Sequence, residues 1–342
     1  MAEKKLRAGV IGCRQGASHA YAYDRADEFE LVAVCDLIPG VLDEFWDRAK
    51  LERGSIPQYS SHREMLDAHD LDVVSVSTPD HIHVDPICDA SNAGVRGVFC
   101  EKPIATTLKD ADKIIETVEG NGTVMSVDHT RSWIPSFQAV KREIDAGKIG
   151  GLTRIIAHLG GHRAMLFRNG THTVDAVCYF AGAPPVWVMA AHEPAMADYG
   201  TEYKGQGGKD PDLDPASTVI IEFANGVRGI LNGAKMVPAL HEIDLQGPEG
   251  RYIIDDDKFA AWRTDSVEGK PIETTPPDAR SYAPFFGDNL IPAVQEMAQM
   301  VLNGAPSSSP VRRARDTLEI LAGALVSQTR NGARVDIPLP RD

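Results

Sequence analysis

The sequence lacks three features that would place it at once in a common class of protein. None of its apolar runs approaches the roughly 20 residues of a membrane-spanning helix, and its first residues show no apolar core of a signal peptide. Only 35 residues are basic against 49 acidic ones, which gives a net charge of −14. Because such a surface repels a phosphate backbone, nucleic acid is not an expected partner.

Cysteine is also scarce, and its placement argues against disulfides. There are five cysteines, an odd number, and they show no close spacing of the metal-binding kind. Most of them lie in apolar runs, as reduced core thiols do. We therefore expect a cytoplasmic protein without structural disulfides.

The chain has 342 residues, enough for two domains of ordinary size, which we expect at 1–127 and 128–342. Short Val- and Ile-rich runs alternate with amphipathic stretches throughout the first of these. Continuous apolar strands separated by helices predict a parallel sheet covered on both faces. The expected strands are 6–11, 31–35, 73–77, 95–100 and 124–127.

After residue 150 the pattern changes to consecutive strand-like runs. The runs 217–223 and 227–233 flank Asn225-Gly226, a strong signal for a hairpin. Runs 240–246 and 251–255 flank a second turn, and helical stretches at 288–303 and 311–329 close the chain. This order predicts an open, mainly antiparallel sheet domain with too few helices to cover both faces. Tyr199 to Asp214 is expected to be a mobile loop.

The first strand-to-helix turn contains Gly12 and Gly16, which would let the backbone approach a pyrophosphate at the helix amino end. The middle glycine of the usual fingerprint is missing, so a plain turn is the alternative. Asp36 ends the second strand about 20 residues later, where an acid would bond the ribose hydroxyls. It would repel a 2′-phosphate, and no arginine follows immediately, which favours NAD over NADP.

Lys102 lies in Glu101-Lys102-Pro103, directly after an apolar run. Ligands bind open α/β sheets at the carboxyl ends of the strands, so this lysine would face the reactive end of the cofactor. The alternative is a surface lysine before a proline. The loop 77–83 follows another buried run and would lie beside the cofactor. His81 and His83 in that loop invite a metal site, but no acidic or cysteine partner is nearby, and we expect no metal.

In the second part, His172 and Asp175 lie three residues apart on a predicted helix and share a face. A histidine there could take a proton from a hydroxyl, with the carboxylate orienting it. The alternative is a capping histidine beside an ordinary helix aspartate. Asp255-Asp256-Asp257 is interpreted as a solvated turn. Trp133 could equally be a core residue or an aromatic surface that contacts a sugar.

These motifs, in this order, resemble the glucose–fructose oxidoreductase, inositol dehydrogenase and rhizopine-catabolism (Gfo/Idh/MocA) family. The resemblance covers nearly the whole chain and includes 128–135, 148–152 and the Gly-x-His-x-x-Asp pattern at 170–175. It implies a Rossmann domain, an open sheet domain, bound nicotinamide cofactor and, usually, a sugar or cyclitol substrate. Many members have an aspartate four residues before the histidine, where this chain has Arg168.

The resemblance implies roles for particular residues. The catalytic set is Lys102, His172 and Asp175. Cofactor contacts are expected from the first turn, Asp36 and the loops after two strands, namely Gly12, Arg14, Gln15, Gly16, Asp36, Thr78, Pro79, His83, Glu101 and Lys102. Substrate contacts are expected from Lys102, His129, Arg131, Trp133, Arg168, Asn169 and His172.

The resulting hypothesis is an NAD-dependent dehydrogenase of a secondary hydroxyl in a sugar, sugar derivative or cyclitol, assembled as a homodimer or homotetramer. One alternative is an NAD-using glycosidase or lyase that acts through a transient keto-sugar. Another is a non-catalytic NAD-binding regulator, which would need neither Lys102 nor His172.

Overall fold

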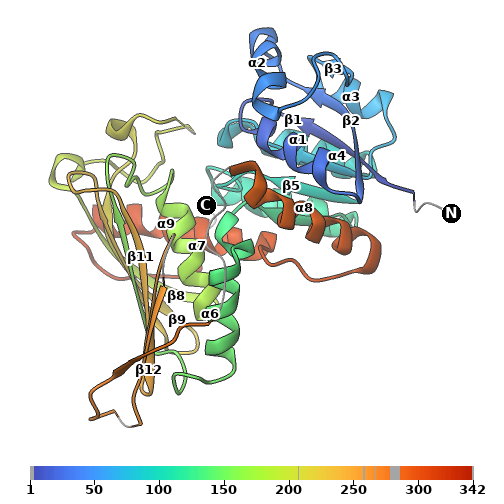
Figure 1. Ribbon diagram of the computed structural model, residues 1–342. Helices are drawn as coiled ribbons and strands as arrows, with labels where there is room; N and C mark the ends of the chain where they lie inside the picture. Colours follow the sequence, from blue (N-terminus) through green and yellow to red (C-terminus); the bar gives the residue numbers. More distant parts are fainter. Residues whose placement is uncertain (1–3, 207, 257–258, 266, 278–285, 341–342) are drawn as a thin grey trace. The chain divides into compact units, whose positions relative to one another are not determined.

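The computed structural model describes residues 4–206, 208–256, 259–265, 267–277 and 286–340. The chain divides into two compact units (Figure 1). The first contains the residues up to Thr130 together with a later segment that ends at Ala314. The second begins at Arg131 and resumes at Arg315. The division therefore differs from a single boundary after residue 127, because a C-terminal helix belongs with the first unit.

The first unit is a six-stranded sheet with the order β3-β2-β1-β4-β5-β6. Every neighbouring pair is parallel, as the buried Val- and Ile-rich runs predict. The short strand β3 was not expected from the sequence. The strands are β1 (Leu6–Ile11), β2 (Phe29–Cys35), β3 (Gln58–Tyr59), β4 (Val73–Val76), β5 (Gly97–Cys100) and β6 (Val124–Val127).

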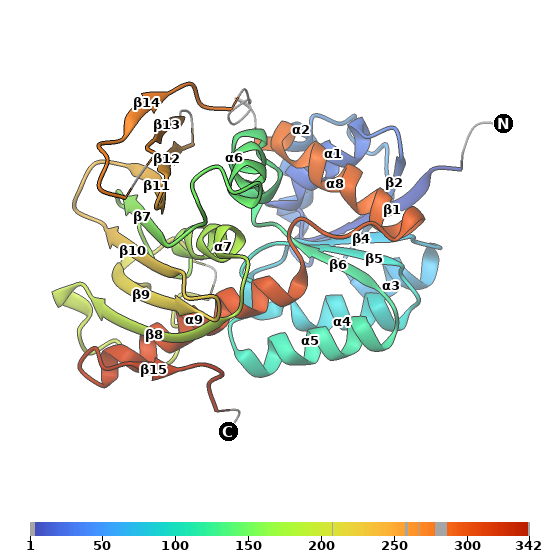
Figure 2. The same cartoon turned by 90° about the horizontal axis from the view of Figure 1, so that it is seen from below.

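Helices cover both faces of this sheet (Figure 2). One face carries α1 (Gly16–Arg25), α2 (Pro39–Ala49) and α8 (Phe286–Asn303), and the other carries α3 (His62–Ala68), α4 (Val84–Asn92) and α5 (Leu108–Gly120). Ser61 and Thr107 cap α3 and α5 by accepting from the N–H groups of Glu64 and Asp110. A short 3-10 turn, η1 (Asp80–Ile82), precedes α4.

Helix α8 packs so closely on β5 that a Cβ at Gly97 would lie 2.8 Å from the Met297 sulfur and from a methyl of Val301. This contact explains the position of the helix, although about 190 residues separate the two elements in the chain. The Rossmann core is thus completed by a segment that the sequence pattern assigned to the second domain.

The second unit is a nine-stranded sheet with the order β14-β13-β12-β11-β7-β10-β9-β8-β15. Its neighbours are antiparallel except for β10 and β7, which run parallel. Both predicted hairpins are present, and Gly226 in the first turn has a φ of +82°. The strands are β7 (Arg154–Gly160), β8 (Pro185–His192), β9 (Ser217–Phe223), β10 (Arg228–Ala234), β11 (Leu240–Gly247), β12 (Gly250–Asp255), β13 (Phe259–Arg263), β14 (Ile272–Thr274) and β15 (Val335–Asp336).

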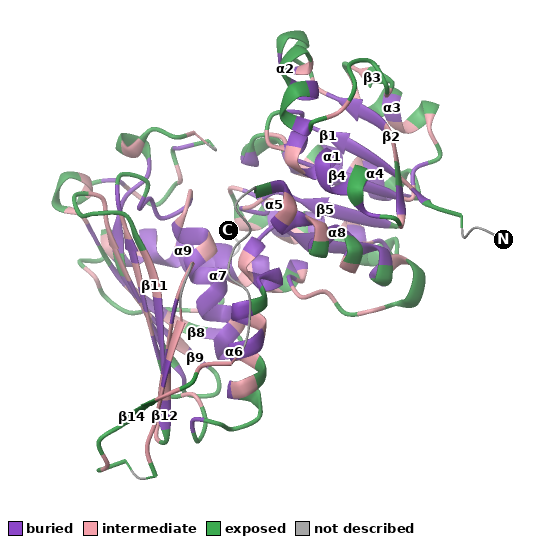
Figure 3. Cartoon of the chain, in the orientation of Figure 1, coloured by how far each residue is buried: buried purple, intermediate pink, exposed green. Residues whose placement is uncertain are grey.

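Three helices lie on one face of this sheet: α6 (Pro135–Asp145), α7 (Gly170–Ala181) and α9 (Val311–Thr329). Close contacts hold two of them, because a Cβ at Gly229 of β10 would meet Val177 of α7 at 2.6 Å, and one at Gly323 of α9 would meet Val188 at 2.5 Å. Residues of the strands alternate between buried and partly exposed (Figure 3). The sheet therefore has one packed face and one open face among the described residues.

Short 3-10 turns complete the second unit: η2 (Thr130–Trp133) at its start, η3 (Pro194–Met196) and η4 (Pro211–Leu213). Across the described part of the chain, no helix combines the length and apolar character needed to cross a bilayer.

The packing of α8 can be tested with two identical substitutions in the same helix. Leu290 is fully buried in the first unit, whereas Leu302 is 52% exposed. Leu290→Ala should lower the free energy of unfolding by about 2–5 kcal/mol, the usual cost of truncating a buried leucine. Leu302→Ala should change it by less than about 0.5 kcal/mol. Urea titration followed by circular dichroism measures both, and equal effects would contradict this packing.

Candidate active site

The first turn of the first unit joins β1 to α1 and has the geometry of a phosphate-binding loop. Gly12 has a φ of +89°, and a Cβ there would lie 2.5 Å from the Ser77 carbonyl carbon, so only glycine fits. Helix α1 begins at Gly16 with no side chain capping its amino end and no acid in its first turn. Its amino end therefore has the charge and the N–H donors that suit a pyrophosphate.

Asp36 follows β2 and is built into this turn. Its Oδ2 accepts from the Cys13 N–H at 2.8 Å, and its Oδ1 accepts from the Ile38 N–H at 2.9 Å. These two bonds fix the carboxylate at the sheet edge while leaving lone pairs on both oxygens for further donors. The next residue is an apolar one, Leu37, which is 72% exposed. The position directly after the carboxylate therefore carries no basic side chain.

The loop that carries Lys102 is anchored at the carboxyl end of β5. The Glu101 N–H donates to the Val76 carbonyl at 2.8 Å, and the Lys102 N–H donates to the Glu101 Oε2 at 3.2 Å. Lys102 itself is partly exposed. The predicted position of this lysine, at the end of a buried parallel strand, is thus where the structure places it.

His83 is buried and joins two loops of this edge. Its Nδ1 lies 3.0 Å from the Pro103 carbonyl oxygen, and its Nε2 lies 3.0 Å from that of Thr78. Burial lowers the pKa of the ring. The ring therefore connects the loop after β4 to the Lys102 loop, and its predicted contact with the cofactor stays a prediction, as do those of Arg14, Gln15, Thr78 and Pro79.

Sequence reasoning missed a buried group of side chains directly behind Lys102. His19 of α1 lies within 4 Å of the carboxylates of Glu101 and Asp128. The aspartate comes from the residue after β6, and the histidine comes from the second turn of α1, so neither has a local signal in the sequence that points to the other.

In the second unit, His172 and Asp175 lie in the first two turns of α7. His172 is partly exposed, whereas Asp175 is buried. The Thr317 hydroxyl of α9 lies 3.5 Å from the Asp175 Oδ1. The helical spacing of three residues places both on one side of the helix, as predicted, and their catalytic roles stay predictions.

Asp214 fixes the segment that leads into α7. Its carboxylate accepts from the backbone N–H groups of Phe167 at 3.0 Å and Arg168 at 2.9 Å. Burial raises the pKa of Asp214 to about 6, although these N–H donors favour the ionised form. The predicted substrate residues Arg168 and Asn169 therefore lie on a segment whose backbone is held from a distant part of the chain.

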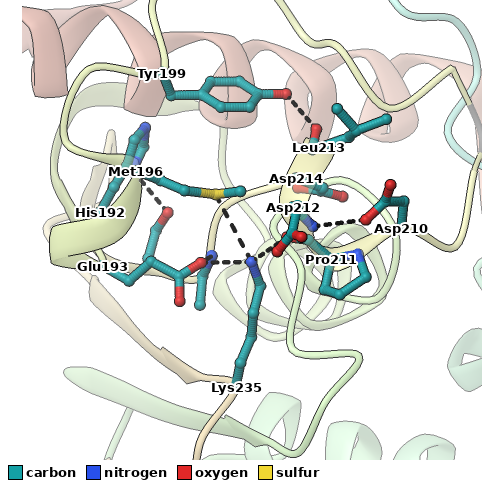
Figure 4. A network of polar contacts seen from close by, with 12 residues as sticks. His192, Glu193, Met196, Tyr199, Asp210, Pro211, Asp212, Leu213, Asp214 and Lys235 are labelled. Carbon is teal, nitrogen blue, oxygen red and sulfur yellow. Dashed lines mark hydrogen bonds and ion pairs between the residues drawn. The ribbon is translucent and has the colours of Figure 1, made fainter.

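Hydrogen bonds hold both ends of the loop from Tyr199 to Asp214 (Figure 4). The mobility expected from its composition stays a prediction. The Lys235 ammonium donates to the Glu193 Oε1 and to the Pro211 carbonyl oxygen, each at 2.5 Å. The Tyr199 hydroxyl donates to the Leu213 carbonyl at 2.7 Å. Lys235 and Glu193 lie outside this loop in the sequence, whereas Tyr199 and Leu213 lie within it.

Arg131 is paired through two nitrogen atoms with Asp256, at 2.9 and 3.2 Å, and the His241 Nδ1 lies 3.0 Å from the same carboxylate. Burial disfavours ionisation of Asp256, but His241 and Arg131 hold its pKa at about 2. Asp256 is therefore an ion-pair partner rather than a residue of a solvated turn. Asp257 lies outside the described residues.

Trp133 and His129 are 3% and 1% exposed. Burial of this degree favours the core alternative for Trp133. Their predicted substrate contacts, like that of Arg131, stay predictions.

Comparison with known proteins assigns the chain to a family. A model of an oxidoreductase family with an NAD-binding Rossmann fold matches residues 6–129, and a GFO/IDH/MocA C-terminal domain model matches residues 137–253. The chain belongs to the GFO/IDH/MocA oxidoreductase family. Its first unit is accordingly the NAD-binding Rossmann domain of that family, and its second is the mainly antiparallel C-terminal domain.

Curated relatives in the family include sugar and cyclitol dehydrogenases. The chain is 27% identical to scyllo-inositol 2-dehydrogenase (NAD(+)) of Bacillus subtilis, over 99% of this chain and 98% of that protein. It is 30% identical to D-glucoside 3-dehydrogenase of Escherichia coli, over 68% and 70% of the two chains. Among solved structures, levoglucosan dehydrogenase in complex with NADH and levoglucosan has a TM-score of 0.77 at 20% identity, covering 98% and 100% of the two chains.

The residues of the first unit fit this cofactor. The close approach of Gly12 to Ser77, the uncapped amino end of α1 and the fixed carboxylate of Asp36 are the three elements that a dinucleotide needs. The glycine fingerprint is altered in sequence, but the tight turn that it serves is present.

Cofactor preference tests the role of Asp36. The double variant Asp36→Ala, Leu37→Arg should lower the ratio of kcat/KM with NAD to that with NADP by about tenfold or more, because hydrogen bonds to a charged group contribute about 1.5–3 kcal/mol. The ratio cancels any general loosening of the turn from the lost bond to Cys13. Leu37→Ala is the control and should leave the ratio unchanged. A wild-type preference for NADP would rule out this role.

Proposed function

We propose that the protein is an NAD-dependent dehydrogenase that oxidises a secondary hydroxyl of a sugar, sugar derivative or cyclitol. The observation that carries the proposal is the place of Lys102, at the carboxyl end of β5 in an NAD-binding Rossmann domain. The activities of the curated relatives support the same substrate class.

In this proposal Lys102 donates a hydrogen bond to the reacting oxygen and stabilises the negative charge that develops there. His172 accepts the hydroxyl proton, a role that contributes roughly 10²–10⁴ in rate. Asp175 orients the histidine, and Arg168 with Asn169 binds the substrate. When bound, NAD supplies the hydride acceptor.

The fixed backbone of the segment that leads into α7 supports the role proposed for His172. Proton transfer requires a donor and an acceptor within hydrogen-bond reach, so the segment that leads to the histidine must keep its place. Asp214 provides this by accepting from two consecutive backbone N–H groups, at Phe167 and Arg168. Arg168 stands where many family members have an acid, and we assign it to an acidic or highly hydroxylated part of the substrate.

We also propose that the protein is cytoplasmic. All five cysteines are free and buried, and burial raises the pKa values of Cys35, to about 12, and of Cys100. Thiols of this kind suit a reducing compartment, where disulfides are rare.

Lys102→Met tests the catalytic proposal directly. It should lower kcat and kcat/KM together by at least about 10²-fold while NAD still binds, because the lost interaction is made in the transition state. His172→Ala should show a similar loss and a flatter pH profile near neutrality. NADH formation and NAD titration by calorimetry are the measurements.

Lys109→Met is the matched control, because Lys109 is an exposed lysine of the same domain. It should keep wild-type activity. If Lys102→Met retains more than about a tenth of the wild-type kcat, this lysine is not catalytic, and the regulator alternative becomes the better account.

We propose a homodimer or homotetramer assembled through the open face of the second sheet. A row of partly exposed apolar residues crosses this face from strand to strand: Met189, Ile220, Ile230 and Ile156, with Ile253 further along. An apolar row of this extent is typical of a surface that is covered in the assembled protein.

Ile230→Glu should dissociate the oligomer, because it places a charge at the middle of this row. Light scattering on the variant should give the 37.1 kDa of one chain, whereas wild type should give two or four times that mass. Leu302→Glu, on α8 of the first unit, is the control and should assemble like wild type. A monomeric wild type would refute the proposed assembly.

A further inference from the structure

Three titratable side chains are enclosed together at the carboxyl edge of the first sheet. His19 comes from α1, Glu101 follows β5 and Asp128 follows β6, and they are 0%, 9% and 1% exposed. The His19 Nε2 lies 3.5 Å from the Glu101 Oε1 and 3.8 Å from the Asp128 Oδ2. We refer to His19, Glu101 and Asp128 as the edge cluster.

Neighbouring groups fix each member of the edge cluster. The His19 Nδ1 lies 3.1 Å from the Ser75 hydroxyl, which in turn lies 3.0 Å from the Tyr23 hydroxyl. The Thr130 hydroxyl donates to the Asp128 Oδ1 at 2.8 Å. With these positions taken, the His19 Nε2 is a buried atom that faces the two carboxylates and has no hydrogen bond within the usual geometry.

The two carboxylates of the edge cluster are buried and both lie close to the same ring. Burial opposes two negative charges in one enclosed place. Burial, together with the charge of Glu101, raises the pKa of Asp128 to about 7. Burial also opposes ionisation of Glu101, but the close His19 ring and the Lys102 ammonium hold its pKa below the ordinary value.

Lys102 is adjacent to this charge. Its backbone N–H donates to the Glu101 Oε2 at 3.2 Å, and its ammonium favours the ionised forms of Glu101 and Asp128. The other titratable groups that face the cluster are His83, which is close to Glu101, Cys100 on β5, and Tyr23 through Ser75. Burial thus acts in opposite directions on these groups, raising the pKa values of Asp128 and Cys100 and lowering that of His83.

We propose that His19, Glu101 and Asp128 share a proton, and that they act as positioning residues for Lys102. The inference rests on the proposed function only for its effect on catalysis. When Asp128 ionises, the negative charge behind the Lys102 loop increases and holds the ammonium toward the cluster. The ionisation state of the edge cluster therefore changes the electrostatic field around the Lys102 ammonium when it contacts the substrate oxygen.

The first test requires no activity. Because the pKa of Asp128 is raised in the folded protein, the native state binds more protons than the unfolded state between the two pKa values, and wild-type stability falls as the pH rises toward 7. Asp128→Asn keeps the shape and removes the ionisation. The melting temperature of Asp128→Asn minus that of wild type should therefore increase as the pH is raised from 5 to 8.

Asp67→Asn, at an exposed aspartate of the same unit, is the matched control and should show a constant difference across this range. A constant difference for Asp128→Asn as well would overturn the proposal. Should Asp128→Asn fail to fold, infrared spectra of wild type and of Asp214→Asn test the proposal instead. Asp214→Asn removes the other buried carboxyl group with a raised pKa. Both proteins should show the carbonyl stretch of a protonated carboxylic acid that disappears near pH 7, and absence of this band would overturn the proposal.

The second test uses turnover. Asp128→Asn should shift the basic limb of the kcat/KM profile to lower pH by about one unit, the low end for loss of a nearby opposite charge, with NAD affinity unchanged. A merely structural role would lower activity equally at all pH values, and that result would contradict the positioning role. If no polyol yields NADH with wild type, the proposed function fails, whereas the melting and infrared results still judge the cluster.

A metal ion would also fit one nitrogen and two carboxylate oxygens at these distances. Elemental analysis of purified wild type and His19→Gln distinguishes the two occupants. The proposal predicts no stoichiometric divalent metal in either protein. One equivalent of metal in wild type that is lost in His19→Gln would overturn the shared proton.

Discussion

The site depends on how closely the loops at the carboxyl edge of a parallel sheet can approach one another. Strand order brings the ends of β1, β4, β5 and β6 to one edge, and the loops then share backbone hydrogen bonds. Gly12 is in contact with the Ser77 backbone, Glu101 bonds to Val76, and Asp128 bonds to Cys100. A side chain at residue 12 would separate the first turn from the loop after β4, and the binding edge would lose its shape.

In the second unit, the corresponding requirement is that the segment leading into α7 keeps its conformation. Asp214 follows η4 and Lys235 follows β10, and through backbone groups they fix the segments before α7 and before β9. Hydrogen bonds between backbone and charged side chains are stronger than hydrogen bonds between neutral groups. A few of them therefore suffice to hold irregular loops.

Sequence patterns predicted what local chemistry determines. The parallel strands, the two hairpins and the places of Asp36, Lys102 and His172 follow from apolar runs and residues at strand or helix ends. The membership of α8 in the first unit did not, because its amphipathic pattern does not state which sheet it covers. The edge cluster was also missed, since His19, Glu101 and Asp128 are far apart in sequence, and only the folded sheet brings His19 within 4 Å of both carboxylates.

The proposed reaction is net oxidation of a secondary alcohol, with hydride passing to NAD. The most direct measurement is the amount of NADH formed per molecule of product, from a panel of sugars, inositols and sugar acids, with the active compound then deuterated at the reacting carbon. A dehydrogenase of this kind should form one NADH per keto product and turn over the deuterated compound more slowly. Consumption of a glycoside without accumulation of NADH would contradict it and would indicate transient oxidation instead.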